Sequence, residues 1–313
     1  MYQVLLYYEF AKVADPDAFT EQTRSFCQEH NLKGRILISE EGINGTCCGA
    51  KADTDAYKAW MKKHKGFENT WYKEQTISHM PFPKLKVRSR EELVTLRSGS
   101  LPVEKGGIHL SPKEVNEMAK RDDVVFLDTR NEIESRVGKF KGAIAPNMKT
   151  FRDFPKTLEE LDDLKDKKII TYCTGGIRCE KATVLMKEHG FEHVYQINGG
   201  IYNYCTQFPD GLFEGTCFVF DDRMQIGFGK DKAVLDEAEV DKTKLISNCE
   251  FCKEKSARCV NDERFKTREL VVCCEACDEA KNISKLRTKE ERAARDSFMG
   301  TLKQKWLEAF SEK

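Results

Sequence analysis

The alternation of apolar and polar residues predicts an α+β module over the first ninety or so residues. Strand–helix–strand, a turn, and then strand–helix–strand is an order typical of a ferredoxin-like fold. The expected elements are a strand at 3–9, a helix from an Asp15 cap to about His30, a strand at 34–39, a turn at 42–45, a helix at 54–64 and an extended segment at 70–79.

Residues 80–108 are rich in proline, glycine and charge, which predicts an extended linker. Ser111, Pro112 and Glu114 then form the start signal of a helix. Beyond them strands and helices alternate, and the strands are continuously apolar, as in a parallel sheet covered on both faces. These elements are strands at 124–128, 168–173 and 194–197 and a helix at 180–189.

The pattern therefore divides the chain into three parts. Residues 1–95 form the ferredoxin-like module, and 96–218 contain the linker and an α/β domain. Residues 219–313 form a cysteine-rich segment that ends in a charged, helix-prone tail from about Ile283 to Lys313. A chain of 313 residues is long enough for two or three domains.

Composition narrows the function classes. The 52 basic and 52 acidic residues balance, so any contact with nucleic acid must come from a local basic patch. No apolar run approaches the roughly 18 residues that span a bilayer. The N-terminus has neither a basic region nor a convincing cleavage site. We therefore expect a cytoplasmic protein that does not bind membranes.

The segment from Tyr172 to Lys181 carries the main candidate chemistry. A buried strand ends at Cys173, the loop residues Thr174, Gly175, Gly176 and Ile177 follow, and a helix begins near Arg178. Ligands of open α/β sheets bind at the carboxyl ends of strands. Amide groups of the loop and the helix N-terminus favour an anion, so the sequence predicts a reactive thiolate at Cys173.

Neighbouring residues have more than one interpretation. Arg178 either pairs with an anionic substrate or fixes the loop and caps the helix. Cys179 is either a resolving thiol or a packed core residue. Asp128 and Arg130 form either a structural ion pair or a catalytic one.

Six of the 13 cysteines fall between Cys249 and Cys277. In a chain without an export signal, such crowding indicates metal binding or thiol chemistry. The pairs Cys249–Cys252 and Cys274–Cys277 each offer two thiolates to one tetrahedral Zn²⁺ with a structural role. An iron–sulfur cluster uses the same ligands and stays an alternative, and Cys259 and Cys273 remain as spare thiols.

The loop Cys173–Arg178 resembles the rhodanese domain. The same likeness extends to Phe126–Arg130, Gly142–Ile144 and the Asn198–Gly200 turn. Taken whole, the chain resembles the bacterial rhodanese-domain tRNA uridine hydroxylases. The wider likeness rests on residues 33–38, 41–46, 82–88, 150–155, 172–181 and 215–221.

This resemblance implies a tRNA-modifying oxidoreductase that converts wobble uridine to 5-hydroxyuridine. Molecular oxygen would be the co-substrate, the anticodon loop of tRNA the partner, and Cys173 a catalytic residue able to carry a persulfide. No organic cofactor is recognisable, and the sequence does not predict an oligomeric state. The basic residues in shared stretches, which we expect to contact RNA phosphates, are Arg35, Lys84, Lys86, Arg88 and Arg152.

Two other functions fit the same residues. One is a rhodanese sulfurtransferase that passes persulfide sulfur from Cys173 to a thiol or a tRNA acceptor. The other is a non-catalytic RNA-binding protein, against which the intact cysteine and loop glycines argue. Fold alone does not separate these functions.

Overall fold

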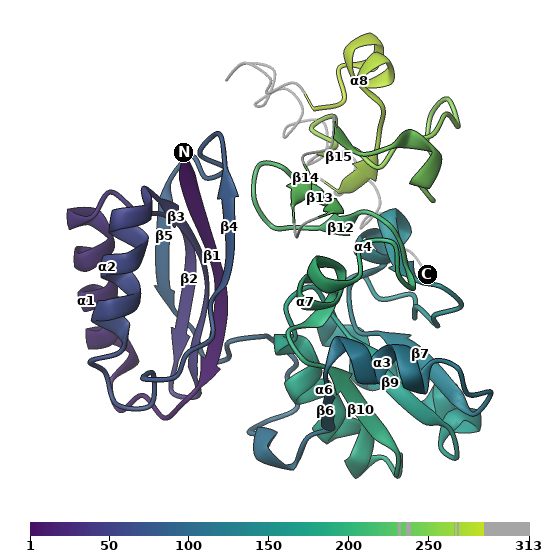
Figure 1. Cartoon of the computed structure of the whole chain (residues 1–313), viewed down its shortest axis with the longest axis horizontal. Coiled ribbons are helices and arrows are strands. Elements are labelled where there is room, and N and C mark those ends of the chain that lie inside the picture. The colour runs from purple at the N-terminus through teal and green to yellow at the C-terminus, as the bar shows by residue number, and fades with distance from the viewer. Residues whose placement is uncertain (231–232, 236–238, 266, 268, 285–313) are drawn as a thin grey trace, which may run out of the picture. The chain divides into compact units, whose positions relative to one another are not determined.

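The computed structural model describes residues 1–230, 233–235, 239–265, 267 and 269–284 (Figure 1). The predicted tail therefore lies, from residue 285 onward, outside the described residues. The chain forms two compact units, Met1–Val240 and Asp241–Lys313. Among the described residues, no helix is both long enough and apolar enough to cross a bilayer.

A five-stranded sheet forms the N-terminal module. Its strands lie in the order β4-β1-β3-β2-β5, and all neighbouring pairs are antiparallel except β2 and β5. The order of the first four strands confirms the ferredoxin-like prediction. The elements are β1 (Tyr2–Phe10), α1 (Pro16–Glu29), β2 (Lys33–Ser39), β3 (Gly42–Gly49), α2 (Lys51–Met61), β4 (Lys73–Ile77) and β5 (Leu85–Ser89).

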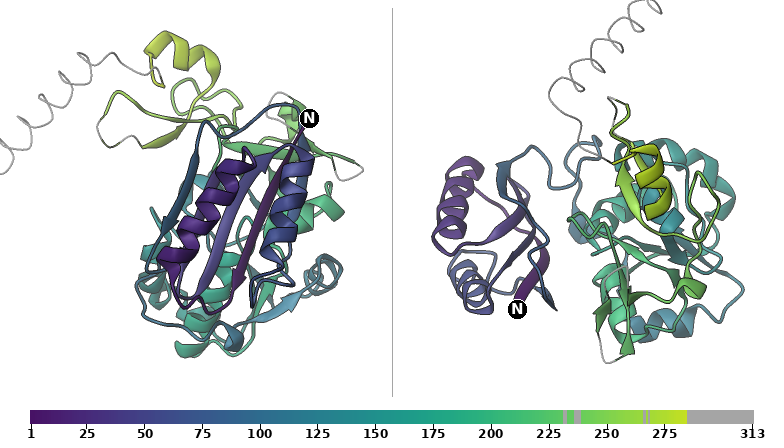
Figure 2. Two further views of the ribbon diagram at one scale, coloured as in Figure 1. Left: turned by 90° about the vertical axis from the view of Figure 1, so that its left-hand side faces the viewer. Right: turned by 90° about the horizontal axis from the view of Figure 1, so that it is seen from above.

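The two faces of this sheet have different roles. Helices α1 and α2 cover one face (Figure 2), where Leu5, Tyr7 and Ile36 belong to a buried core with the helical residues Phe19 and Tyr57. The other face is the more polar of the two, although apolar residues such as Leu6 also belong to it. One row of paired residues crosses all five strands there: Lys73, Leu6, Thr46, Arg35 and Lys86.

Two predictions in this module are wrong. The turn expected at 42–45 is the start of β3, because the reversal is made by Glu40 and Glu41. Gly42 is needed for a close approach rather than for a turn: a Cβ there would lie 2.0 Å from the carbonyl oxygen of Glu9. The predicted linker contains β5, whose pairing with β2 is too distant in sequence for local patterns to reveal.

The second domain is built on a parallel sheet in the order β6-β10-β9-β7. Ile169 and Ile170 of β9 belong to two different core clusters, so both faces of the sheet are covered, as predicted. The elements are β6 (Ile108–Leu110), α3 (Pro112–Met118), β7 (Val124–Asp128), α4 (Glu132–Val137), β8 (Gly138–Phe140), α5 (Phe154–Thr157), β9 (Lys168–Tyr172), α6 (Ile177–Glu188), β10 (Val194–Ile197) and α7 (Gly200–Gln207).

Short antiparallel strands follow α7 and complete the first unit. β11 (Phe213–Gly215) pairs with β8, and β12 (Cys217–Phe218) pairs with β13 (Gln225–Phe228), which in turn pairs with β14 (Val234–Leu235).

The described part of the second unit contains the strand pair β15 (Cys259–Asn261) and β16 (Leu270–Val272), followed by α8 (Glu275–Lys281).

Candidate active site

The loop after β9 wraps around the sulfur of Cys173. The amide of Gly176 donates a hydrogen bond to Cys173 Sγ over 3.1 Å. Gly176 has a φ of 107°, a left-handed conformation that glycine adopts without strain and that turns the chain into α6. Amides of α7 anchor the loop from behind, since Ile201 N donates to Cys173 O over 2.9 Å and Tyr202 N to Thr174 O over 3.1 Å.

The surroundings of Cys173 stabilise a thiolate. Burial alone would raise the pKa of this thiol, which is only 1% exposed. Hydrogen bonding from Cys179, the charge of Arg178 and the amides of Arg178 and Gly176 outweigh burial and lower the pKa to about 5. The partner Cys179 has a pKa raised well above its ordinary value, first by burial and then by Cys173 itself, so it stays a protonated donor.

Arg178 is held by an ion pair inside the protein. Its two terminal nitrogens bind the two carboxylate oxygens of Glu134 over 2.6 and 2.8 Å, and one also lies 3.5 Å from Thr174 Oγ1. Glu134 is fully buried in α4, and burial of its carboxyl is outweighed by Arg178, which lowers its pKa. The guanidinium is thus fixed beside the loop and contributes positive charge there.

The supporting residues from the neighbouring strand lie deeper. Arg130 and Asp128 have fully buried side chains and form an ion pair with a shortest distance of 2.6 Å. Arg130 also donates to the carbonyl of Gly138 over 2.5 Å. Neither residue lines the pocket described below, which favours the structural interpretation. Cys179 is likewise buried within α6, 3.5 Å from Thr129 Oγ1.

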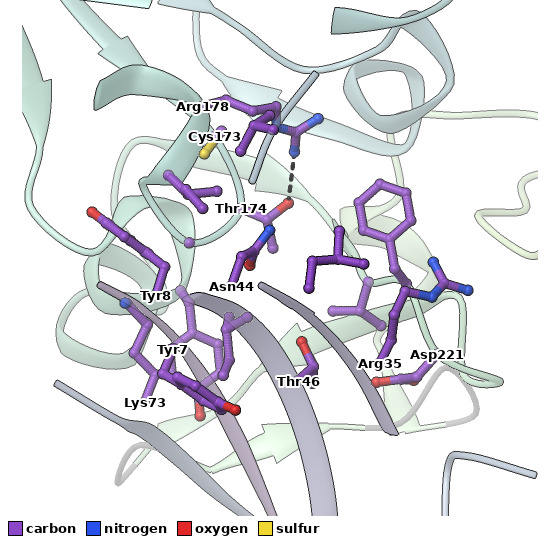
Figure 3. Close-up of a pocket in the computed structure, with 18 of the residues that line it drawn as sticks. Tyr7, Tyr8, Arg35, Asn44, Thr46, Lys73, Cys173, Thr174, Arg178 and Asp221 are labelled. Carbon is purple, nitrogen blue, oxygen red and sulfur yellow. Dashed lines mark hydrogen bonds between the residues drawn. The ribbon is translucent and has the colours of Figure 1, made fainter. Parts of the chain in front are cut away.

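A pocket of about 370 Å³ opens in front of Cys173 (Figure 3). This volume lies in the range of roughly 300–1,000 Å³ that is typical of ligand sites. One wall is the loop after β9, with Cys173 and Arg178. The opposite wall is the polar face of the N-terminal sheet, including Tyr8, Asn44 and Lys73.

Two successive residues of α6 bind the N-terminal module and so hold the two walls together. Glu180 accepts a hydrogen bond from the hydroxyl of Tyr8 over 2.7 Å. Lys181, only 1% exposed, forms ion pairs with Glu41 over 2.8 Å and with Glu92 over 2.9 Å.

Two of the five predicted RNA-binding residues line this pocket, and the other three lie next to one of them. Arg35 and Arg152 line it. Arg35 also pairs in register with Lys86, and the charges of Arg35, Lys84 and Arg88 lower the pKa of Lys86, so these four residues form one cluster. We call Arg35, Lys84, Lys86 and Arg88 the basic edge.

Several pocket residues were not predicted from the sequence. Lys73, Gln75 and Asn44 come from strands of the N-terminal sheet, and Phe220 follows β12 with half of its side chain exposed. Strand alternation divides such residues between two faces but does not say which face another domain covers. Burial alternates along β4 in the structure, where Lys73 and Gln75 are buried, but the sequence Lys-Glu-Gln-Thr-Ile has no apolar alternation that could have revealed this.

The cysteine-rich segment brings four predicted ligands together. The Sγ atoms of Cys249, Cys252, Cys274 and Cys277 all lie within 4.8 Å of one another. A tetrahedral site with Zn–S bonds of about 2.3 Å places its sulfurs about 3.8 Å apart, and Cys252 Sγ and Cys274 Sγ are separated by 3.6 Å. The four thiols therefore fit a tetrahedral metal ion. The spare thiols Cys259 and Cys273 are buried outside this group.

Comparisons with known proteins match three stretches of the chain. Family models match at residues 2–93 (UPF0176 acylphosphatase like domain), 111–207 (rhodanese-like domain) and 214–287 (Rhodanase C-terminal). Among solved structures, the rhodanese-like domain of an Anabaena protein matches with 21% identity and a TM-score of 0.29, over 34% of this chain and 78% of its own.

Full-length relatives match much more closely. The chain is 42% identical to a tRNA uridine(34) hydroxylase of Corynebacterium diphtheriae, over 88% of this chain and 91% of the relative. It is also 42% identical to a protein of the same name from Cytophaga hutchinsonii, over 89% of this chain and 86% of the relative.

Proposed function

Because this chain belongs to the tRNA uridine(34) hydroxylase family, we propose that it hydroxylates the wobble uridine of tRNA at C5, with Cys173 as the catalytic nucleophile and molecular oxygen as co-substrate. The family expected from the sequence motifs is confirmed by these relatives. The observation that carries the residue assignments is the pocket, in which an acidic thiol faces the polar side of a sheet with a basic edge.

The basic residues suit an RNA substrate. Arg35, Lys84, Lys86 and Arg88 lie together on the edge of the sheet, and Arg152 lines the pocket from the second domain. Such a cluster can neutralise several phosphates and orient the RNA without reading its sequence. The anticodon loop offers unpaired bases, one of which can leave its stack and enter the pocket.

Cys173 supplies the nucleophile. Its thiolate can add to C6 of the uracil ring, which forms the S–C6 bond, breaks the C5–C6 π bond and raises the electron density at C5. The backbone amide of Gly176 holds the sulfur, and the loop residues Thr174, Gly175 and Ile177 shape the backbone around it. Arg178, which is bound to Glu134, acts on the charge of the thiolate rather than on an RNA phosphate.

The test is a direct assay of product. Unmodified tRNA is incubated with the protein and a thiol reductant, in air and under nitrogen, and its nucleosides are measured by mass spectrometry. The reductant supplies the two electrons that convert the second oxygen atom of dioxygen to water. We expect uridine to gain one oxygen atom in air only.

Cys173→Ser and Cys205→Ala separate catalysis from folding. Cys205 is a buried thiol of the same domain that does not line the pocket, so its variant should retain activity. Cys173→Ser should lose activity and keep its melting temperature. Normal tRNA modification by Cys173→Ser would overturn the assignment of the nucleophile. Sulfur transfer from thiosulfate to cyanide, with unchanged tRNA, would instead support the sulfurtransferase.

A further inference from the structure

Strand β4 presents two buried polar side chains to the pocket. Lys73 is 5% exposed and Gln75 is 7% exposed, and both line the cavity in front of Cys173. They are two residues apart on one strand and pair in register with Leu6 and Val4 of β1, which line the same pocket. Their side chains therefore occupy one face of the sheet, next to each other.

The side-chain amide nitrogen of Gln75 is a donor that has no acceptor among the described residues. Gln75 Oε1 accepts a hydrogen bond from Arg223 Nη1 over 2.9 Å. Because a guanidinium can only donate, this contact fixes the orientation of the amide. Gln75 Nε2 is then left buried with no hydrogen-bond partner in the part of the chain that the structure describes. An unsatisfied buried donor destabilises the protein, and a bound ligand with an acceptor would remove that penalty.

Lys73 is a second donor on the same face of β4. Its Nζ lies 4.4 Å from the centre of the Trp71 ring and 5.2 Å from that of Tyr8. No described carboxylate forms an ion pair with it. Burial lowers its pKa to about 8, against the opposing effect of Cys173, Glu180 and Glu9. At neutral pH it is mostly protonated and can donate to an acceptor on the ligand.

We infer that Lys73 and Gln75 form a donor pair that recognises the carbonyl oxygens of the uracil ring and excludes cytosine. The inference rests on the proposed function, because it specifies which base the same pocket accepts. Uracil has carbonyl acceptors at C2 and C4, whereas cytosine has an amino donor at C4. A donor facing a donor leaves both groups unsatisfied, and polar sites discriminate strongly on that basis.

The experiment compares two anticodon stem-loop RNAs that differ only in uridine or cytidine at position 34. Binding of each RNA is measured for the unaltered protein and for Gln75→Leu, Gln75→Glu and Lys73→Met. The unaltered protein should prefer the uridine RNA. Gln75→Leu and Lys73→Met should each reduce that preference by roughly tenfold, the equivalent of one lost hydrogen bond.

Gln75→Glu keeps the hydrogen bond from Arg223 but changes which groups the side chain can bind in the pocket. Its carboxylate can still accept from Arg223, but its other oxygen replaces a donor with an acceptor. The preference should therefore shift toward cytidine, whose amino group can donate to that oxygen. This variant keeps the test decisive if Lys73→Met or Gln75→Leu fails to fold.

The outcomes distinguish the two proposals. An unchanged preference for uridine in folded Gln75→Glu and Lys73→Met would overturn the donor pair, even if the protein hydroxylates tRNA. A preference for uridine that depends on both residues, without any hydroxylation of tRNA in air, would support the donor pair and overturn the proposed reaction.

Discussion

The ionisation of Cys173 depends on groups within a few residues of it along the chain. Gly176 and Arg178 contribute amides, and Arg178 contributes a guanidinium that Glu134 holds in place. An ordinary cysteine has a pKa near 8.5, so most of it is protonated at neutral pH. Here the thiolate forms as the pH rises through about 5 and persists at every higher pH.

The lowered pKa of Cys173 predicts how the rate of its alkylation depends on pH. The rate at which iodoacetamide modifies Cys173 should be nearly constant from about pH 6.5 to 9 and should fall only as the pH approaches 5. Modification is followed by mass spectrometry of the peptide that contains Cys173, with Cys173→Ser protein as the background. A rate that rises tenfold per pH unit up to pH 8 would show an ordinary thiol.

The sequence revealed Cys173 because the groups that act on it are contiguous. A glycine-bearing loop between a buried strand and a helix is a local signal, and its geometry follows from that order. Lys73 and Gln75 gave no comparable signal. Their role depends on the second domain covering one face of β4, and on Arg223, nearly 150 positions away, orienting the amide of Gln75.

At the scale of single elements, strand β5 adds basic side chains to the edge of the N-terminal sheet. It adds a parallel strand to β2. Its side chains Lys86 and Arg88 alternate with residues that face the helices, and Lys84 directly precedes the strand. The basic edge thus combines charges from two strands that are about fifty residues apart in sequence. A local pattern predicts the charges but not this pairing, which is why the segment resembled a linker.

The basic edge predicts the salt dependence of tRNA binding. Lys86→Glu together with Arg88→Glu should weaken binding by at least about tenfold at moderate salt and reduce the slope of log affinity against log salt. The matched control is Lys62→Glu with Lys63→Glu, two exposed lysines that follow α2. Binding is measured by titration at several salt concentrations. Equal losses in both double variants would indicate a general charge effect rather than a defined RNA site.

The whole molecule contains two units with different sources of stability. The first has large apolar cores on both sides of its parallel sheet. The described part of the second has a small apolar cluster that itself includes several of the cysteines. Small domains with little core usually depend on a metal or on disulfides. The fold class was predictable from the alternation of apolar and polar residues, and the four clustered cysteines from their spacing. The identity of the metal ion does not follow from either pattern.

We expect about one zinc ion per chain, bound by Cys249, Cys252, Cys274 and Cys277. Chelation should accelerate hydrogen exchange in β15 and β16 and leave β9 protected, because metal binding and folding are coupled. Cys252→Ala should lose the zinc, and Cys259→Ala should keep it. Elemental analysis and hydrogen exchange provide the measurements. A preparation that contains no zinc, or mainly iron, would contradict this expectation.

The contacts of α6 determine whether the protein or the nucleic acid changes conformation when substrate binds. Lys181 is buried between Glu41 and Glu92, and Glu180 is bound to Tyr8. Moving the N-terminal module away from the Cys173 loop would therefore leave the buried charge of Lys181 without its partners. The pocket is therefore preformed, and the conformational change on binding occurs in the nucleic acid. Binding then includes the free-energy cost of unstacking one base. RNA loops whose bases already point outward have the lowest such cost and should bind most readily.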